Sequence, residues 1–485
     1  MPSKKIVCLG GGSGYFAGAL GDLAIRKGLK GSEIVLYDID IERAKLMARC
    51  GMRLSSMAGA GFKIYATRDL QEALYGVHFA IGNIGGIGGG GGGFHKTGGV
   101  HVKDFLISAK YGIYQVVGDT GGPAAMMAAF RTIPIYLNIF KRLGERCLRV
   151  IFVNHANPMA ILCRAMNKYA GLKGVIGICH GVQGGVNYIA EILKVPAEEL
   201  DTIWIGTNHY YWFTEIYHRG KNIYPELRRR MTLCKPPSGY TMHARLSNIF
   251  GYQIVYPDDS HIIEFYPYLS QVKDGDHLPY GIPKSHHGVD VTKMYAAHGL
   301  AGRGKKIKEK SITRRMILKD FNEHLDRSIK DFANRLNEPE YGAHPHEKVD
   351  EDVIASMERK MAFVESVGSL IEAIALGRRK VHIVNIPNKG AVPNLPHTAV
   401  LEIEGVTDSC GIRGLHMAEA PLALKGQLEK MIAWQELVVE AAVKGDKNLA
   451  LQALMLDPMA ILPEKAEKML DELLANSKEL LPQFK

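Results

Sequence analysis

The stretch KKIVCLGGGSG, residues 4–14, decides the fold class of this 485-residue chain. A short β-rich run ends here in a glycine turn, a helical pattern follows, and a second strand at residues 33–37 ends at Asp38. Strand, glycine turn, helix, strand and acid are typical of a dinucleotide-binding fold. The glycines let the backbone approach a pyrophosphate, the helix N-terminus favours its charge, and Asp38 accepts hydrogen bonds from ribose hydroxyls. The alternative is a purely structural glycine turn.

Further β-rich runs continue this pattern, and each precedes a turn or a helical stretch. They lie at residues 62–65, 77–81, 149–153 and 174–178. The sequence therefore predicts an α/β fold with a Rossmann-type, doubly wound sheet of about six mostly parallel strands, formed by residues 1–190. Residues 191–485 show mixed strands and long helices without internal repeats, which predicts a second, mixed α+β domain.

Composition places the chain among ordinary globular proteins. Hydrophobic residues make up 46% and charged residues 23%, and the net charge of +10 is compatible with an anionic ligand. No apolar run approaches the roughly 20 residues of a membrane-spanning helix, and the first residues are typical of a strand, not of a signal peptide. Seven singly spread cysteines favour a reducing, cytoplasmic location. The basic stretch 302–315 lacks interleaved aromatic residues, so we expect a solvated helix face or connection there and no nucleic-acid partner. Because no apolar run is long enough to span a membrane, we expect no membrane partner.

Four polar clusters contain the residue types best suited to chemistry. They are residues 117–123 with 131–134, residues 154–158, residues 179–184 with 207–209, and residues 256–264. Cys179 and His209 offer sulfur and nitrogen to a divalent metal, but their spacing matches no local zinc motif, and a buried cysteine with a structural histidine is the alternative. Asp259 is a candidate general base, or else a loop cap or surface ion pair. Asn157 before Pro158 is a polar candidate, or simply the start of a helix.

Together these pieces resemble glycoside hydrolase family 4, the NAD- and metal-dependent glycosidases. The motifs are GGGS near the start, LYDID (36–40), GIYQVVGDTGGP (112–123), RTIP (131–134), NHANPMA (154–160), GICHGVQGG (177–185), GTNHYYWF (206–213), DDSHIIEFYPY (258–268), VNIPNKGAVPNLP (384–396) and GDKNLALQALMLDP (445–458). The resemblance implies a lactate/malate-dehydrogenase-like fold. GIYQVVGDTGGP and the Asp-x-His of residues 259–261 are most similar to the α-galacturonidase branch.

One segment departs from the family pattern. Most family members have a compact strand end that contains an arginine here, whereas this chain has NIGGIGGGGGGFHKTGG at residues 83–99. We therefore carry over no cofactor or substrate contact onto residues 84–99. The glycine tract at 85–93 is either a disordered connection or a loop over the cofactor at the carboxyl end of a strand.

The resemblance implies hydrolysis of an α-glycosidic bond, in an acidic sugar such as an α-galacturonide, with no net redox change. Sugar C3 is oxidised transiently by NAD+, C2 is deprotonated, the leaving group is eliminated, water adds and the ketone is reduced again. Cys179 and His209 match the metal ligands, and Mn2+ is the expected ion. Asp259 matches the general base, with Asp258 as its rival, and His180 helps to protonate the leaving oxygen. The remaining matches are Asn157 and Asp119 for the substrate, and Gly10, Gly12, Ser13 and Asp38 for NAD.

Several alternatives remain open from the sequence. Within the same family, the alternative substrates are an α-glucoside, an α-glucuronide and a 6-phosphoglycoside. Outside it, the alternatives are a 2-hydroxyacid dehydrogenase and a non-catalytic NAD-binding protein. Arg131 and Arg245 are candidates, by residue type only, for binding a substrate carboxylate. The resemblance implies a homodimer or a homotetramer.

Overall fold

The computed structural model describes residues 3–85, 99–143, 150–172, 174–233, 241–254, 261–266, 285–286, 289–290, 294–295, 298–300, 313–337 and 366–484. All but the first residue of the glycine tract at 85–93 lies outside these residues, so its interpretation stays a prediction. No helix in the described part of the chain is both long and apolar enough to cross a membrane. None of the cysteines in that part forms a disulfide.

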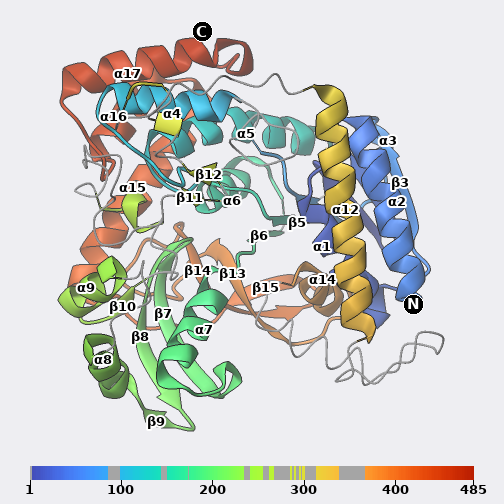
Figure 1. Ribbon diagram of the computed structural model, residues 1–485, viewed down its shortest axis with the longest axis horizontal. Helices are drawn as coiled ribbons and strands as arrows, with labels where there is room; N and C mark the ends of the chain where they lie inside the picture. Colours follow the sequence, from blue (N-terminus) through green and yellow to red (C-terminus); the bar gives the residue numbers. More distant parts are fainter. Residues whose placement is uncertain are drawn as a thin grey trace.

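A nine-stranded sheet forms the centre of the molecule (Figure 1). Six of its strands run parallel in the order β3-β2-β1-β4-β5-β6, which confirms the predicted Rossmann-type sheet. They are β1 (Lys5–Leu9), β2 (Glu33–Tyr37), β3 (Lys63–Thr67), β4 (Phe79–Gly82), β5 (Ile151–Asn154) and β6 (Gly174–Gly177). The winding reverses between β1 and β4, and open α/β sheets bind ligands at the carboxyl ends of the strands beside such a reversal.

Three strands from the second half of the chain extend the same sheet. β13 (Val381–Pro387) pairs antiparallel with β6, and β14 (Val400–Asp408) and β15 (Gly411–Gly414) follow it outward. The main sheet therefore crosses the division that the sequence suggests at residues 190 and 191. This extension is absent from the sequence-based expectation.

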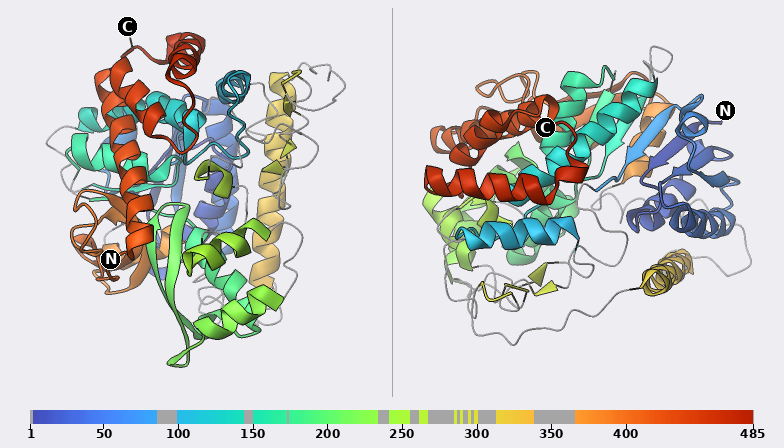
Figure 2. Two further views of the ribbon diagram at one scale, coloured as in Figure 1. Left: turned by 90° about the vertical axis from the view of Figure 1, so that its left-hand side faces the viewer. Right: turned by 90° about the horizontal axis from the view of Figure 1, so that it is seen from above.

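Helices cover both faces of the main sheet (Figure 2). Right-handed crossovers put helices on opposite faces when a chain winds in opposite directions from the same strand. One packed group consists of α1 (Tyr15–Ala24), α2 (Ile41–Met57), α12 (Arg314–Asn337) and α14 (Val367–Ala375). The other contains α4 (Val100–Lys110), α5 (Gly122–Leu143), α6 (Met159–Tyr169) and α15 (Leu422–Lys444). The short α3 (Leu70–Leu74) lies between β3 and β4 in the chain.

A smaller antiparallel sheet and its helices form the mixed second region. Its strands are β7 (Leu200–Thr207), β8 (Tyr210–His218), β9 (Lys221–Asn222) and β10 (Gln253–Ile254), and its helices are α7 (Gly181–Leu193), α8 (Tyr224–Leu233) and α9 (Thr241–Phe250). A separate two-stranded ladder joins β11 (Ser285–His286) to β12 (Val289–Asp290). This region agrees with the mixed α+β architecture that the sequence predicts.

The C-terminal helices pack on the core of the same molecule. α15 lies against α5 and α6, and it buries Leu428, Trp434 and Val438 completely. α16 (Lys447–Leu456) packs on α15, and α17 (Pro463–Asn476) packs on α16 and α4. α15 thus uses its apolar face within the chain.

Candidate active site

The glycine turn after β1 packs so closely against Asn83 and Leu36 that Gly10 and Gly11 have no room for a side chain. Gly10 has a φ of +81°, and a Cβ atom there would lie 2.6 Å from the carbonyl oxygen of Asn83. A Cβ atom at Gly11 would lie 2.8 Å from the Cα atom of Leu36. The amides of Gly10 and Gly11 both donate to the carbonyl oxygen of Tyr37, at 3.0 and 2.8 Å. The turn is therefore a backbone cradle at the start of α1, as a pyrophosphate requires.

Polar contacts fix both edges of this cradle. The Asp38 carboxylate accepts the amide of Gly12 at 2.8 Å and that of Asp40 at 2.7 Å. On the other edge, the Ser13 hydroxyl donates to the Asn83 side chain at 2.7 Å. All four residues predicted for NAD, namely Gly10, Gly12, Ser13 and Asp38, thus lie in one turn and the strand end beside it. Asn83, which directly follows β4 and accepts the Ser13 hydroxyl, was not singled out in the sequence.

An aromatic stack joins the cradle to β5. Tyr15, the first residue of α1, lies on the His155 ring with centroids 3.9 Å apart and planes 15° from parallel. Asn83 also donates to the carbonyl oxygen of His155 at 2.8 Å. The carboxyl ends of β1, β4 and β5 are therefore connected by side chains, and the stack leads from the glycine turn toward the NHANP motif.

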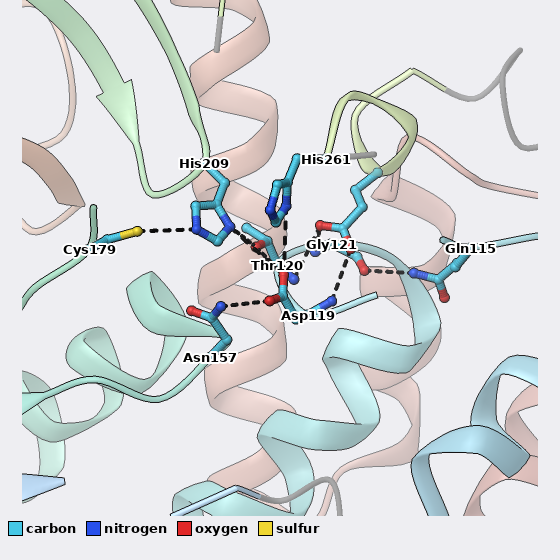
Figure 3. Close-up of polar contacts among 9 residues, drawn as sticks. Gln115, Asp119, Thr120, Gly121, Asn157, Cys179, His209 and His261 are labelled. Atoms are coloured by element: carbon cyan, nitrogen blue, oxygen red, sulfur yellow. Dashed lines mark hydrogen bonds and ion pairs between the residues drawn. The ribbon is translucent and has the colours of Figure 1, made fainter. Parts of the chain in front are cut away.

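Cys179 and His209 come together although 30 residues separate them. Cys179 follows β6, and His209 lies in the tight turn between β7 and β8 with a φ of +59°. Both residues are buried, and the Cys179 Sγ atom lies 3.2 Å from His209 Nε2 (Figure 3). Bonds from sulfur and nitrogen to a divalent ion are about 2.0–2.3 Å long, so this separation lets one ion contact both atoms.

The loop before α5 supplies the oxygen side of the site. The Asn157 side-chain amide donates to Asp119 Oδ2 at 2.7 Å, so the two residues predicted to contact the substrate are direct partners. The Thr120 hydroxyl donates to Asp119 Oδ1 at 2.8 Å and lies 2.7 Å from His209 Nδ1. Figure 3 shows Asp119 between Asn157 and the two histidines.

His261 also belongs to this cluster; the sequence placed it in the polar run 256–264 but assigned it no role. Its Nδ1 atom lies 3.9 Å from Asp119 Oδ1, and its ring lies on that of His209 with centroids 4.1 Å apart. Ligand atoms of Asp119, His209 and His261 all fall within 4.8 Å of one another. These three residues offer imidazole nitrogens and a carboxylate, and Cys179 adds a thiol at the Nε2 atom of His209. Such donor types suit a divalent transition-metal ion, so the residues fit the expected metal.

Of the residues proposed for proton transfer, the structure describes His180 but not Asp258 or Asp259. His180 is exposed and is the N-cap residue of α7, directly after Cys179. Asp258 and Asp259 lie outside the described residues, which resume at His261. The motif that holds Asp259 nevertheless contains His261 and Glu264, and an Asp-x-His-x-x-Glu run was the available signal for both.

Glu264 holds the loop of residues 119–121 through its backbone amides. It is fully buried, and its carboxylate accepts the amides of Asp119 at 2.9 Å and of Thr120 and Gly121 at 3.2 Å each. Burial, and then the charge of Asp119, raise the pKa of Glu264 well above its ordinary value. The carboxylate of Asp457 accepts the next amide, that of Gly122, at 3.1 Å. Four successive amides are therefore held by two buried carboxylates.

Arg131 does not stand ready to bind a substrate carboxylate. It is 3% exposed, and its guanidinium contacts Asp104 at 2.6 Å and the Ser477 hydroxyl at 3.1 Å. This arrangement ties α4 and α5 to the end of α17, and it pairs the guanidinium with a buried carboxylate inside the protein. Arg245 lies exposed on α9.

Comparisons with known proteins agree with this architecture. The model for "Family 4 glycosyl hydrolase" matches residues 5–195, and that for "Family 4 glycosyl hydrolase C-terminal domain" matches residues 204–460. An alpha-galactosidase of Bacillus subtilis is 28% identical over 99% of this chain and 100% of its own length. An alpha-galacturonidase of Thermoanaerobacter italicus is 25% identical over 98% of this chain and 97% of its own length.

Solved structures share the fold at lower identity. A 6-phospho-alpha-glucosidase from gut microorganisms has a TM-score of 0.70 and 20% identity, with all of both chains covered. A 6-phospho-beta glucosidase from Thermotoga maritima has a TM-score of 0.68 and 21% identity over 98% of each chain. Because the two family models together span nearly the whole sequence, this chain belongs to family 4 of the glycosyl hydrolases.

Proposed function

We propose that this protein hydrolyses the α-glycosidic bond of an acidic sugar, an α-galacturonide, with NAD+ and Mn2+ as cofactors. The observation that carries the proposal is the pairing of Cys179 and His209, 3.2 Å apart, beside Asp119 and Asn157. A soft sulfur, an imidazole and hydroxyl-binding oxygens suit a metal ion that must also bind a sugar. A plain hydroxyacid dehydrogenase has no use for such a thiol.

Two kinds of residues would hold the cofactors. The backbone cradle at Gly10 and Gly12, with Asp38 at the ribose position, fits NAD+. Cys179 and His209 fit the ion, and the structures of the 6-phospho-glucosidases named above contain NAD and manganese. When bound, the two groups supply a hydride acceptor and a Lewis acid for the sugar hydroxyls.

The side chains around the cofactors would position the sugar and move its protons. Asp119 and Asn157 support each other through one hydrogen bond, so they would orient sugar hydroxyls as a rigid pair. Asp259, or its neighbour Asp258, would remove the C2 proton. The exposed His180, next to Cys179, would reach the leaving oxygen from the solvent side.

The choice of a uronide as substrate rests on sequence motifs and on the activities of relatives. The DTGGP and Asp-x-His motifs and the alpha-galacturonidases among the relatives favour a uronide. A neutral α-galactoside is the second candidate, because the alpha-galactosidase of Bacillus subtilis is the relative with 28% identity. Glucosides, glucuronides and 6-phosphoglycosides remain further alternatives.

Release of phenol from an aryl α-D-galacturonide tests the proposal. The metal-stripped, reduced protein is assayed with NAD+ alone, Mn2+ alone and both, and aryl α-galactoside, α-glucoside, α-glucuronide and 6-phosphoglycosides are run beside it. We expect turnover only with both cofactors, and no accumulation of NADH. Cys179→Ser is the inactive control, and Cys410→Ser, an exposed free thiol far along the chain, is the matched active one.

Each alternative has its own result in this assay. Activity on another glycoside, with the same cofactor requirement, would retain the reaction and replace the substrate. NADH accumulation with lactate or malate would identify a dehydrogenase. NAD+ binding without turnover, unchanged by Cys179→Ser, would identify a non-catalytic NAD-binding protein. Sedimentation tests the proposed homodimer or homotetramer, which a monomer alone would contradict.

A further inference from the structure

The Thr120 hydroxyl lies between two residues of the proposed metal and substrate site. Its oxygen is 2.8 Å from Asp119 Oδ1 and 2.7 Å from His209 Nδ1. A threonine hydroxyl has one proton to donate and two lone pairs to accept with. It gives the proton to the Asp119 carboxylate, which is an acceptor only, and it therefore accepts from the His209 ring.

This count of protons fixes the tautomer of His209. If the Thr120 oxygen accepts, His209 Nδ1 carries the hydrogen, and the other nitrogen of a neutral ring is left with its lone pair. That other nitrogen, Nε2, is the atom 3.2 Å from Cys179 Sγ. The hydrogen bond from Nδ1 thus turns the metal-binding face of the ring toward the thiol, as outer hydrogen bonds commonly do for ligating histidines.

Thr120 is itself held in place from several directions. Its amide donates to the buried Glu264 at 3.2 Å, and the amides on either side, of Asp119 and Gly121, donate to the same carboxylate. The Gln115 side chain donates to the carbonyl oxygen of Gly121 at 3.0 Å (Figure 3). Thr120 is 3% exposed, so water does not compete for its hydroxyl. The hydroxyl therefore has one defined position relative to the His209 ring.

We propose that Thr120, held by Glu264, is a positioning residue that sets the tautomer and ring orientation of His209 for the metal ion shared with Cys179. The inference rests on the proposed function only in its use of a metal at these two residues. It adds that the family motif GDTGGP acts on the metal through the threonine hydroxyl, and that Glu264 acts only through the backbone of that loop.

Metal titration of matched variants tests this role. Thr120→Val keeps the shape of the side chain and removes the hydroxyl, whereas Thr120→Ser keeps the hydroxyl. Thr132→Val removes another buried hydroxyl, which donates within α5 to the carbonyl oxygen of Ala128, and serves as the control. Mn2+ and Co2+ affinities of the reduced protein are measured by calorimetry, and the thiolate-to-cobalt absorption band reports on Cys179.

We expect Thr120→Val to bind both ions about 10–100-fold more weakly, the usual cost of losing an outer partner of a metal ligand. Thr120→Ser and Thr132→Val should stay within about threefold of the wild type, and NAD+ affinity should change in none of the three. Glu264→Gln, which keeps the side-chain size but replaces one acceptor oxygen by a donor, should also weaken metal binding. Excess Mn2+ should restore part of the lost kcat/KM in Thr120→Val.

Two results would overturn the proposal. One is equal metal affinity in Thr120→Val and the wild type, and the other is an equal loss in Thr120→Val and Thr120→Ser, which would assign the effect to packing. The proposed function fails differently. A wild-type protein that binds the ion but cleaves no glycoside would refute that function, while the expected contrast between the valine and serine variants would still support the role of Thr120.

Discussion

Two loops of this molecule precede helices at the carboxyl end of the same sheet, and opposite means hold them in place. Residues 10–14 lead into α1, and their amides are arranged by glycines, by the Tyr37 carbonyl oxygen and by Asp38. Residues 119–122 lead into α5, and their four amides donate to the buried carboxylates of Glu264 and Asp457. The first loop is held by local residues, the second by residues more than 140 positions away.

The difference matters for what each helix end can bind. α1 has no side-chain hydrogen bond at its N-cap and no acidic residue in its first turn, so its positive end is suited to an anionic group. At α5, the side chains of Glu264 and Asp457 already accept the amides of residues 119–122, so these amides are not available to an anion. The second loop instead presents side chains, Asp119 and Thr120, toward Asn157 and His209. The first loop thus offers the N-terminal end of a helix without a side-chain cap, and the second offers side chains.

The largest effect should follow removal of the carboxylate beneath the second loop. Glu264→Ala leaves three buried amides without their acceptor, and each unsatisfied group costs about 1–3 kcal/mol. We expect the free energy of unfolding to fall by roughly 3–6 kcal/mol, measured by urea denaturation. Glu429→Ala, on the exposed face of α15, should stay within about 0.5 kcal/mol. Similar losses in both variants would contradict the dependence of this loop on Glu264.

Asp457 should make the stability of the second loop depend on pH. Burial raises the pKa of Asp457 from 3.8 to about 7. Because the folded state binds the Asp457 proton more tightly than the unfolded state, protonated Asp457 stabilises the fold. Its contribution to the free energy of unfolding is complete below about pH 4 and is lost as the pH rises through about 7. A rise of about 3 pKa units corresponds to about 4 kcal/mol. In Asp457→Asn this part of the pH dependence should disappear, whereas the exposed Asp471→Asn should keep it; identical profiles in all three proteins would exclude Asp457 as its source.

The first loop should respond to a single methyl group. Gly10→Ala places a Cβ atom 2.6 Å from the Asn83 carbonyl oxygen at a φ of +81°. Strain of this kind costs about 1–3 kcal/mol, so we expect an unfolding free energy lower by about 2 kcal/mol and NAD+ affinity reduced at least tenfold. Calorimetric titration with NAD+ measures the second effect. Unchanged NAD+ binding would show that the cradle does not contact the cofactor.

The smallest effect has the opposite sign. Gly18 lies inside α1, and a Cβ atom there would meet nothing within 4 Å. Gly18→Ala should therefore stabilise the protein by about 0.5–1 kcal/mol, because alanine is the better helix former. Thermal unfolding and NAD+ titration of this variant provide the matched glycine control for Gly10→Ala. A loss of NAD+ affinity here would mean that any change in α1, and not only the cradle, disturbs the cofactor.

The same contrast explains what the sequence could predict. The parallel sheet and its cradle follow from contiguous signals, since Gly10, Gly12 and Asp38 fall within 30 residues and the backbone geometry at Gly10 demands glycine. Cys179 and His209 were selected through the family resemblance, because their spacing alone carries no metal motif. Glu264 fell within the polar run 256–264 but was given no role, since a glutamate reveals its burial only through partners far along the chain. The same limit applied to β13, whose pairing partner β6 is remote in sequence.

The pairing of β13 with β6 also has a consequence for how the chain is made. β6 ends at Gly177, and β13 begins only at Val381, roughly 200 residues later. A ribosome adding about 5–20 residues per second needs on the order of 10–40 s to synthesise that interval. During this time the nascent sheet ends in an open β6 edge, and open edges pair readily with other chains. Binding of a chaperone during synthesis would therefore matter most between the appearance of β6 and that of β13.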